Sequence, residues 1–441
     1  MRDILSDGIF KKSAKGLLIL LSGIVLGYLA LVLVYILPIE PMKKHIRESQ
    51  SLLEAEGIQP VLVEGYTTTR LDNYSEGLFL NSAIYDGKES VWEKAAAIYQ
   101  YRYGEEDYYH SLLKYLDAEP DVSVDSYERD WHGYLIYVKP LLLCMNYSDI
   151  RVINMALQII AVIYLFFCMC KQRIEKYIPA FAMTLLFLTW GTLFFSLEYS
   201  ALFYVFVMAS IFILKKNEYI LERKIISELF LLIGMIVSYI DVLTYPMLTI
   251  GIPLVFLFIL NENWSKNVKS AISHIAVASF WWLCGYGGMW LGKWIISGVI
   301  LKTNVIKESI LMALYRMSQT SGESGTMIEF TALEVLAKNF GVFFKPMYLI
   351  ALACFGIWFI VKVIKFGLVI SPSKIVAFSI VMCMPIVWYL ALGNHSYIHY
   401  WMTHRSIALI VFAGTVMLIG MIDTKEGRVI SHDGKEACRV I

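Results

Sequence analysis

Long apolar runs recur along almost the whole chain, and they constrain its fold more than any other feature. The first run covers residues 16–37, and most runs can cross the roughly 30 Å hydrocarbon core of a bilayer as a helix. Hydrophobic residues make up 58% of the 441 residues and charged residues only 17%, which is unlike a soluble domain. We therefore expect an all-α polytopic bundle of about ten transmembrane helices, with further spans near 152–170, 177–195, 200–214, 226–243, 244–260, 271–292, 342–364, 375–392 and 401–422.

Basic residues indicate the orientation of these spans. Every second connection carries Lys or Arg, as in residues 171–176 and 215–224, and the basic N-terminus and tail fall on the same side. The opposite connections, such as residues 196–200 and 393–400, contain no Lys or Arg. The positive-inside rule then places both termini in the cytoplasm of a multi-pass plasma membrane protein. The first run is too long for a cleaved signal, so we expect it to be a retained anchor.

The predicted topology divides the chain into four parts. These are a cytoplasmic N-terminus with the first span (1–38), an extracytoplasmic cap (39–150), the transmembrane bundle (151–422) with a second outer segment near 295–341, and a cytoplasmic tail (423–441). Apolar residues at helical spacing near 90–117 predict amphipathic helices in the cap. We expect the cap to dock on the bundle and to lie partly in the membrane interface. A separate soluble cap with its own core is the alternative.

The cap contains one acidic motif that suggests chemistry. Asp72 and Glu76 stand at i and i+4 with Tyr74 between them, so a helix would place both carboxylates on one face. A partly desolvated carboxylate is suited to act as a general base, because burial brings its pKa toward the working pH. The structural alternative is that Asp72 caps the following helix and Glu76 is solvated.

Ionisable residues also lie at the outer ends of the predicted spans. Such groups indicate a functional site, because each is costly in a membrane unless it faces a cavity or a partner; they are Glu198, Asp241, Lys293, His395, His399, His404 and Arg405. Arg405 is suited to bind a lipid phosphate, and snorkelling to headgroups is its alternative. His395 and His399 have the spacing of zinc ligands, but no third ligand is near in sequence. Asp241 either caps a tight turn or faces the outer cavity.

The order of these features resembles the GT-C superfamily of integral membrane glycosyltransferases. In its aminoarabinose and protein mannosyl transferase branches, an acidic stretch in the first outer loop supplies the catalytic Asp, and Asp72 and Glu76 stand in a similar stretch. Residues 131–134 and 139–141, followed by Arg151, resemble that family's approach to its second span.

The resemblance implies a sugar donor linked to polyprenyl phosphate, and a glycan, lipid or protein acceptor outside the cytoplasm, in an enzyme surrounded by membrane lipids. Asp72 would deprotonate the acceptor, Glu76 would position Asp72 or the acceptor, and the sugar would be transferred with inversion. The leaving phosphate would be held by Arg405 with help from Arg151, Lys293 or His399, and the substrate site would further include His395, Asp241 and Tyr74. No cofactor is certain. A divalent metal stays open, because Asn73 stands where the family often has a second acid.

Two other functions also fit the sequence. A transporter or flippase for a polar or lipid-linked substrate would use the same buried charges as a pathway, although no inverted hydropathy repeat is visible. An inactive assembly subunit would keep the shape of the superfamily without its chemistry. Nucleic-acid binding is not expected, because the formal net charge is only +1 and no basic patch is concentrated in the sequence.

Overall fold

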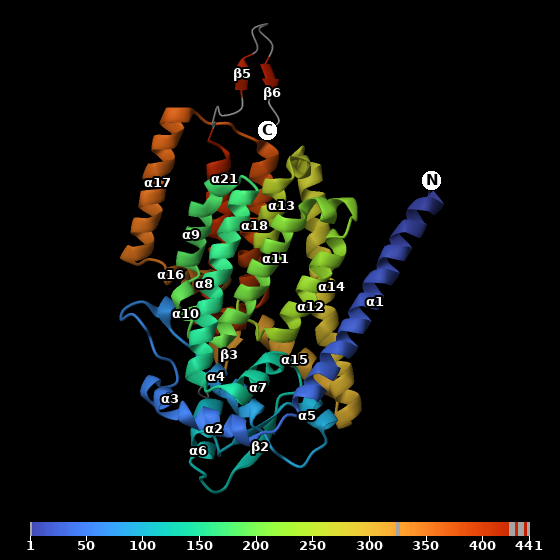
Figure 1. The fold of residues 1–441 in the computed structure, drawn as a ribbon, viewed down its shortest axis with the longest axis vertical. Coiled ribbons are helices and arrows are strands. Elements are labelled where there is room, and N and C mark those ends of the chain that lie inside the picture. The colour runs from blue at the N-terminus through green and yellow to red at the C-terminus, as the bar shows by residue number, and fades with distance from the viewer. Residues whose placement is uncertain (1, 323–326, 423–427, 431–435, 439–441) are drawn as a thin grey trace.

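The computed structural model describes residues 2–322, 327–422, 428–430 and 436–438, and it is overwhelmingly helical (Figure 1). Helices make up 75% of the chain and strands very little. Six helices are long and apolar enough to cross a membrane. The chain is therefore a helical membrane protein, as the apolar runs predict. Most of the tail predicted at 423–441 lies outside the described residues.

The six apolar helices fall on predicted spans. They are α1 (Arg2–Val34), α8 (Tyr147–Lys171), α11 (Leu197–Glu222), α17 (Pro346–Phe366), α18 (Pro372–Ala391) and the segment Tyr400–Gly420, which is made of α20 (Tyr400–Thr403), η5 (His404–Ser406) and α21 (Ile407–Gly420). Other predicted spans correspond to α9 (Ile178–Phe187) with α10 (Trp190–Leu193), α12 (Ile226–Ile240), α13 (Met247–Leu260) and α14 (Val268–Leu301), with η2 (Glu175–Tyr177) and η3 (Glu262–Ser265) between them.

Two of these helices differ from the expected spans. The run at 177–195 is not one helix, because Thr189 adopts a left-handed conformation with φ of 52° and separates α9 from α10. The run at 200–214 looked short, but α11 has 26 residues, with a kink at Lys216 (φ −127°, ψ 22°) directly after this run. Hydropathy gave no sign of this extension, because helices continue beyond the hydrocarbon core into polar surroundings.

Short helices build the cap at one end of the molecule (Figure 1). They are α2 (Glu40–Glu48), α3 (Gln50–Glu56), η1 (Thr67–Thr69), α4 (Asn73–Ala83), α5 (Val91–Ala97), α6 (Tyr108–Leu116) and α7 (Leu135–Cys144). The helices predicted near 90–117 are present as α5 and α6, but a strand separates them. Ile98 is left-handed after α5, and Tyr99 begins β1 (Tyr99–Arg102), which pairs antiparallel with β2 (Ser123–Ser126). The second outer segment holds α15 (Val305–Met317), β3 (Thr320–Ser321), β4 (Ile328–Glu329) and α16 (Ala332–Gly341), and the tail holds β5 (Arg428–Ile430) and β6 (Glu436–Cys438).

The cap shares a hydrophobic core with one side of the bundle, and most of the remaining bundle helices pack in a second core. Buried residues of α4, α5, α6 and α7 pack in the same cluster as Leu31 of α1 and Met289 of α14. The indole of Trp131 donates a 2.7 Å hydrogen bond to the Met289 carbonyl. Gly133 lies so close to α12 that a Cβ there would be 2.4 Å from the Tyr239 carbonyl oxygen. The cap is therefore packed against α1, α12 and α14 and does not form a core of its own.

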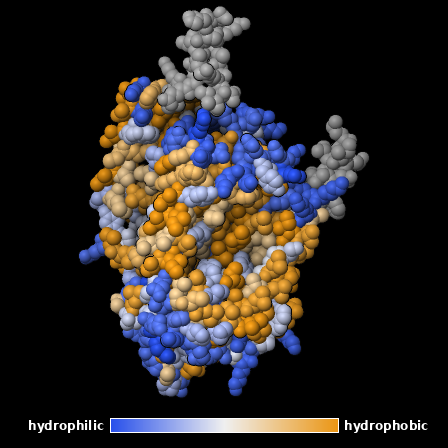
Figure 2. All heavy atoms as spheres, viewed as in Figure 1, coloured by the Kyte–Doolittle hydropathy of each residue, from blue (hydrophilic) through white to orange (hydrophobic). Residues whose placement is uncertain are grey.

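Glycines bring α12 and α14 close together along the bundle. A Cβ on Gly234 would lie 2.1 Å from the Trp282 carbonyl oxygen, and one on Gly285 would lie 2.1 Å from the Leu231 carbonyl oxygen. Small residues permit this close approach of helix backbones in membranes. Hydrophobic residues cover much of the visible bundle surface, while hydrophilic residues gather over the cap and near the opposite end (Figure 2). The beginning of α1 and the end of α21 both lie at the end away from the cap (Figure 1).

Candidate functional site

Asp72 is the N-cap of α4, at the point where the cap meets the bundle. Its carboxylate accepts hydrogen bonds from the Ser75 backbone N–H at 3.4 Å and from the Ser75 hydroxyl at 3.2 Å. The side chain is buried, and burial raises the pKa of Asp72 to about 6. Asp72 therefore caps a helix, as the structural alternative predicts, and burial raises its pKa toward neutral pH, while its role as a general base stays a prediction.

Glu76 is not solvated, because it joins α4 to α8 and α11. Its carboxylate accepts hydrogen bonds from the Tyr147 hydroxyl, from the Ser196 hydroxyl at 2.9 Å and from the Glu198 backbone N–H at 3.0 Å. It is fully buried, and burial raises its pKa. With three donors already on its oxygens, Glu76 holds the beginning of α11 against α4.

Arg405 lies in η5, where the last span is interrupted. Its guanidinium donates to the Trp401 carbonyl at 3.0 Å and to the Thr192 hydroxyl at 3.0 Å, and it stacks 3.7 Å from the centre of the Tyr199 ring. Thr192 belongs to α10 and Tyr199 to the first turn of α11. Arg405 is completely buried, so it does not snorkel to the surface and the snorkelling interpretation is wrong.

Asp72 and Arg405 converge on the beginning of α11 although more than 300 residues separate them. Glu76, in the helix that Asp72 caps, binds the Glu198 backbone, and Arg405 stacks on the adjacent Tyr199. The Glu198 side chain, next to Tyr199 in the chain, is buried as well. Arg70, two residues before Asp72, stacks on Trp401, whose carbonyl binds Arg405. We call this group, made of Arg70, Asp72, Glu198, Tyr199 and Arg405, the α11 cluster.

Several buried polar atoms of the α11 cluster lack a hydrogen-bond partner among the described residues. They are Nε of Arg70, Oε2 of Glu198, the hydroxyl of Tyr199 and Nε of Arg405. A buried polar group without a partner is costly and rare in proteins, so several in one place indicate that a polar ligand or water completes the site.

Asp241, His395 and His399 form a second polar group near the first. Asp241 accepts hydrogen bonds from the Thr244 backbone N–H at 3.1 Å, so it caps the turn between α12 and α13, and burial raises its pKa to about 6. His395 binds the Leu243 carbonyl at 2.8 Å, which ties α19 (Gly393–Ile398) to the same turn.

Both histidines are kept neutral. Burial lowers the pKa of His395 well below its usual value and that of His399 to about 4, and the nearby charge of Arg316 acts in the same direction. Their rings are 4.8 Å apart between centres. Within the described residues, no group of three or more His, Cys, Asp or Glu side chains has the geometry of a metal site. A metal at the histidines is therefore not supported by a third ligand.

Arg151 of α8 contacts the beginning of α4, and Tyr74 belongs to α4, but neither is part of the α11 cluster. Arg151 forms an ion pair with Glu56 at 2.6 Å and donates to the Asn73 side-chain oxygen at 3.2 Å. Asn73, which occupies the position of a second acid in the resemblance, therefore connects Arg151 to the cap. Tyr74 is partly exposed and packs edge-on against Tyr108 at 5.6 Å between ring centres.

Lys293 lies elsewhere and caps a helix end. Its ammonium donates to the Ala95 carbonyl at 3.2 Å and to the Ala96 carbonyl at 2.8 Å, close to the end of α5. A cation is favourable at a helix C-terminus, where the last carbonyls lack partners. Its amine therefore faces cap carbonyls, and the structure does not bring it to Asp72 or Arg405.

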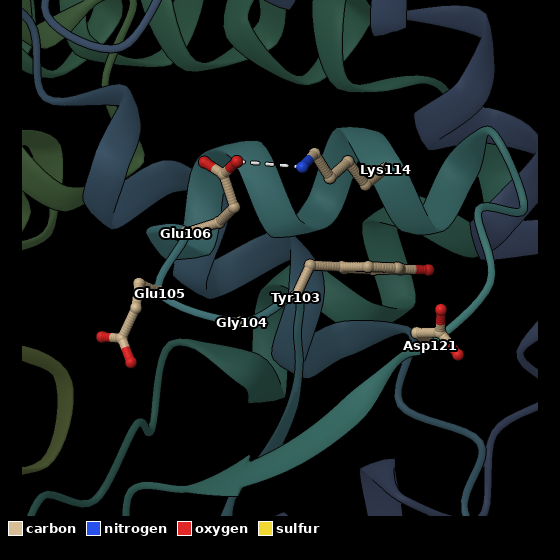
Figure 3. A pocket seen from close by; sticks show the side chains of 6 residues that line it. All are labelled: Tyr103, Gly104, Glu105, Glu106, Lys114 and Asp121. Carbon is tan, nitrogen blue, oxygen red and sulfur yellow. Dashed lines mark hydrogen bonds and ion pairs between the residues drawn. The ribbon is translucent and has the colours of Figure 1, made fainter.

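The cap also has an open hollow of about 550 Å³ on its surface (Figure 3). Lys114 and Glu106 form an ion pair at 2.9 Å across one side of this hollow. None of the residues that line it is a predicted site residue. The hollow therefore gives no support to the predicted site.

The sequence interpretation missed several members of the α11 cluster. Arg70 and Tyr199 were not assigned a role, and neither was Thr192, which binds Arg405 from outside the cluster. Thr192 and Tyr199 lie near the ends of apolar runs, whereas Arg70 lies within the cap. Ser196, which caps α11, is a local signal of a helix start that points to this place. Comparison of the chain with models of protein families, with curated proteins and with solved structures found no match.

Proposed function

We propose that this chain is an integral membrane glycosyltransferase that moves a sugar from a polyprenyl-phosphate carrier to an acceptor outside the cytoplasm. The observation that carries the proposal is that α4, which the buried carboxylate of Asp72 caps, and the buried guanidinium of Arg405 both contact the beginning of α11. Arg70, Glu198, Tyr199 and Arg405 each keep a buried polar atom without a partner among the described residues, as expected of a site that a substrate completes. The further spans, the cytoplasmic termini and the extracytoplasmic cap belong to the same proposal.

The chemistry assigns opposite roles to the two charges. Asp72, with a pKa of about 6, is mostly ionised at neutral pH and is still basic enough to take a proton from an acceptor hydroxyl. The acceptor oxygen then bonds to the anomeric carbon, and the bond from that carbon to the phosphate oxygen breaks. The electron pair leaves with the phosphate, whose charge Arg405 stabilises. One displacement of this kind inverts the anomeric carbon.

Contacts limit the roles of the other residues. Glu76 is a positioning residue, because Tyr147, Ser196 and the Glu198 backbone occupy its oxygens. Lys293 contacts carbonyls of α5, so we assign help with the phosphate to Arg70 instead. The guanidinium of Arg70 retains an unpartnered Nε and lies 4.4 Å from the Trp401 ring, which neighbours Arg405.

Substitution of the two charged residues tests the proposal. Purified protein in lipid nanodiscs is given a radiolabelled polyprenyl-phosphate sugar, and binding and release of the sugar are measured separately. Asp72→Asn keeps the shape and removes the base, so turnover falls by about 100-fold or more while carrier binding persists. Arg405→Ala weakens both binding and turnover. Asp149→Asn, on an exposed residue of α8, is the matched control and leaves both unchanged. Full turnover by Asp72→Asn contradicts the proposal.

A transporter or flippase is the second candidate, and one observation favours it. Two helices, the α9–α10 pair and the α20–α21 pair, are interrupted beside Arg405, and transporters often bind substrates between interrupted helices. Proteoliposomes that move a lipid-linked sugar between leaflets without transferring it would support transport over catalysis. The expected result is release of the sugar only when an acceptor is present.

A further inference from the structure

A half-enclosed hollow of about 310 Å³ lies at the end of the bundle away from the cap. Residues from the connection before α9, from the ends of α13 and α21 and from the beginning of α18 line it. Its floor is apolar and includes Phe258, Phe378 and Val416. The hollow shares no residue with the α11 cluster, and the inference drawn from it does not depend on the proposed glycosyltransferase activity.

The rim of the hollow is basic. Arg173, Lys176 and Lys374 line it together with a single carboxylate, Glu262. The ion pair between Lys374 and Glu262 is loose, at 3.9 Å, and the Glu262 side chain is largely exposed. Three cations against one exposed carboxylate leave an excess of positive charge over an apolar floor. This combination suits an anionic group that carries an apolar tail.

Arg173 adopts a backbone conformation that is unfavourable for any residue with a Cβ atom. It follows the end of α8 with φ of 56°, in the left-handed conformation that favours glycine after a helix. The bond from the Ile174 N–H to the Met169 carbonyl, at 3.0 Å, completes a Schellman turn. The chain therefore places a guanidinium at the hollow at a conformational cost that glycine would avoid.

The surroundings of the hollow favour a lipid over a free anion. The connection between α17 and α18 forms one wall, and three consecutive residues of it, Leu368, Val369 and Ile370, are exposed apolar side chains. The backbone of Val369 is fixed to the end of α21 by a 2.8 Å bond to the Met421 carbonyl. Exposed apolar residues beside a basic rim are typical of a surface in contact with bilayer headgroups and acyl chains.

We propose that this hollow binds the phosphate headgroup of an anionic phospholipid in the leaflet opposite the cap. Arg173, Lys176 and Lys374 contact the phosphate oxygens, and the acyl chains leave the hollow over residues 368–370. Burial lowers the pKa of Lys176, but its usual value is so high that the amine is still charged at neutral pH. The basic connections at this end assign it to the cytoplasmic leaflet.

Native mass spectrometry of the delipidated full chain tests the proposal. Phosphatidylglycerol and phosphatidylcholine with the same acyl chains are titrated, and the bound fractions are compared. We expect phosphatidylglycerol to bind about ten times more tightly than phosphatidylcholine. The double variant Lys176→Ala/Lys374→Ala loses on the order of twentyfold in phosphatidylglycerol binding, about fivefold for each lysine.

Control variants separate the site from general charge and from misfolding. Lys269→Ala/Lys365→Ala removes two lysines at the same end that do not line the hollow, and it changes binding by less than about twofold. Arg173→Gly raises the melting temperature of lipid-free protein while it weakens phosphatidylglycerol binding, a pair of effects that misfolding cannot produce. Equal losses in both double variants, or displacement of the lipid by millimolar glycerol phosphate, would overturn the lipid site.

Discussion

Replacing Asp72 by Asn should stabilise the protein while it abolishes activity. Asn is as good an N-cap as Asp, and its side-chain oxygen accepts the bond from the Ser75 N–H, so the shape of the site is kept. What changes is the charge. The pKa of Asp72 rises from 3.8 to about 6 on folding, because the carboxylate is buried. Its ionisation therefore costs folding free energy, and the Asn variant avoids this cost.

The size and the sign of this change in stability follow from the pKa shift of Asp72. A group whose pKa is higher in the folded state binds its proton more tightly there, so stability is lost as pH rises from about 4 to about 6. A shift of about two units corresponds to about 3 kcal/mol at pH values above this window. The stability advantage of the Asn variant over wild type should thus grow by about 3 kcal/mol between pH 4 and pH 7.5. Activity of the wild type should fall below about pH 6, when Asp72 takes up a proton.

Thermal unfolding in one detergent, at pH 4, 5, 6 and 7.5, measures this difference. Asp149→Asn removes an exposed carboxylate and should give a pH profile parallel to that of wild type. The reasoning is refuted if the Asp72→Asn variant is less stable than wild type at pH 7.5, or if the gap between them does not widen with pH. A more stable but inactive variant is the behaviour expected of an active-site residue whose burial opposes folding.

Three further predictions follow from contacts in the cap and from the topology. Glu76→Ala should cost roughly 4 kcal/mol because it leaves three buried donors unpaired, whereas Glu76→Gln should cost much less; denaturation of both variants measures the difference. Gly133→Ala should cost roughly 2 kcal/mol or more, since its Cβ would meet the Tyr239 backbone; a Gly287→Ala control, where the space is open, should show little change in melting temperature. A cysteine at Ser90 should react with an impermeant thiol reagent on intact cells and one at Ser431 should not, and the reverse pattern would invert the topology.

The apolar runs predict most of the helices because hydrophobic length is a property of the sequence alone. The break between α9 and α10 was not predictable in this way. Neither Gly nor Pro stands at Thr189, and its left-handed conformation depends on the structure around it. Its carbonyl accepts a 2.8 Å bond from the Thr192 hydroxyl, and that hydroxyl also accepts a bond from Arg405. The break therefore depends on a residue more than 200 positions away.

From the sequence, one could predict the side of the membrane on which the candidate site lies, but not which residues form it. Charge at the outer ends of spans indicates where ionisable groups gather, but Lys293 and Arg405 look alike by that criterion. The structure separates them, because Lys293 finds backbone carbonyls at the end of α5 and Arg405 faces α11. For Glu76 the sequence left open a positioning role or a solvated side chain, and the structure gives it three donors, from α8, the α11 cap and the α11 backbone. Contacts between distant segments decide these roles.

The interruption at η5 explains how a guanidinium is held among apolar helices. A continuous helix uses all its interior carbonyls for its own backbone, so it offers few acceptors to a buried arginine. Between α20 and α21 the helix changes to a 3₁₀ turn, and Arg405 donates to the carbonyls of Trp401 and Met402. The two carbonyls and the Thr192 hydroxyl bind only the terminal nitrogens of the Arg405 guanidinium. Its Nε has no partner among the described residues. In the proposed function, acceptors that fix one edge of the guanidinium while another donor stays unpaired suit an incoming anion, because binding then requires no reorganisation of the arginine.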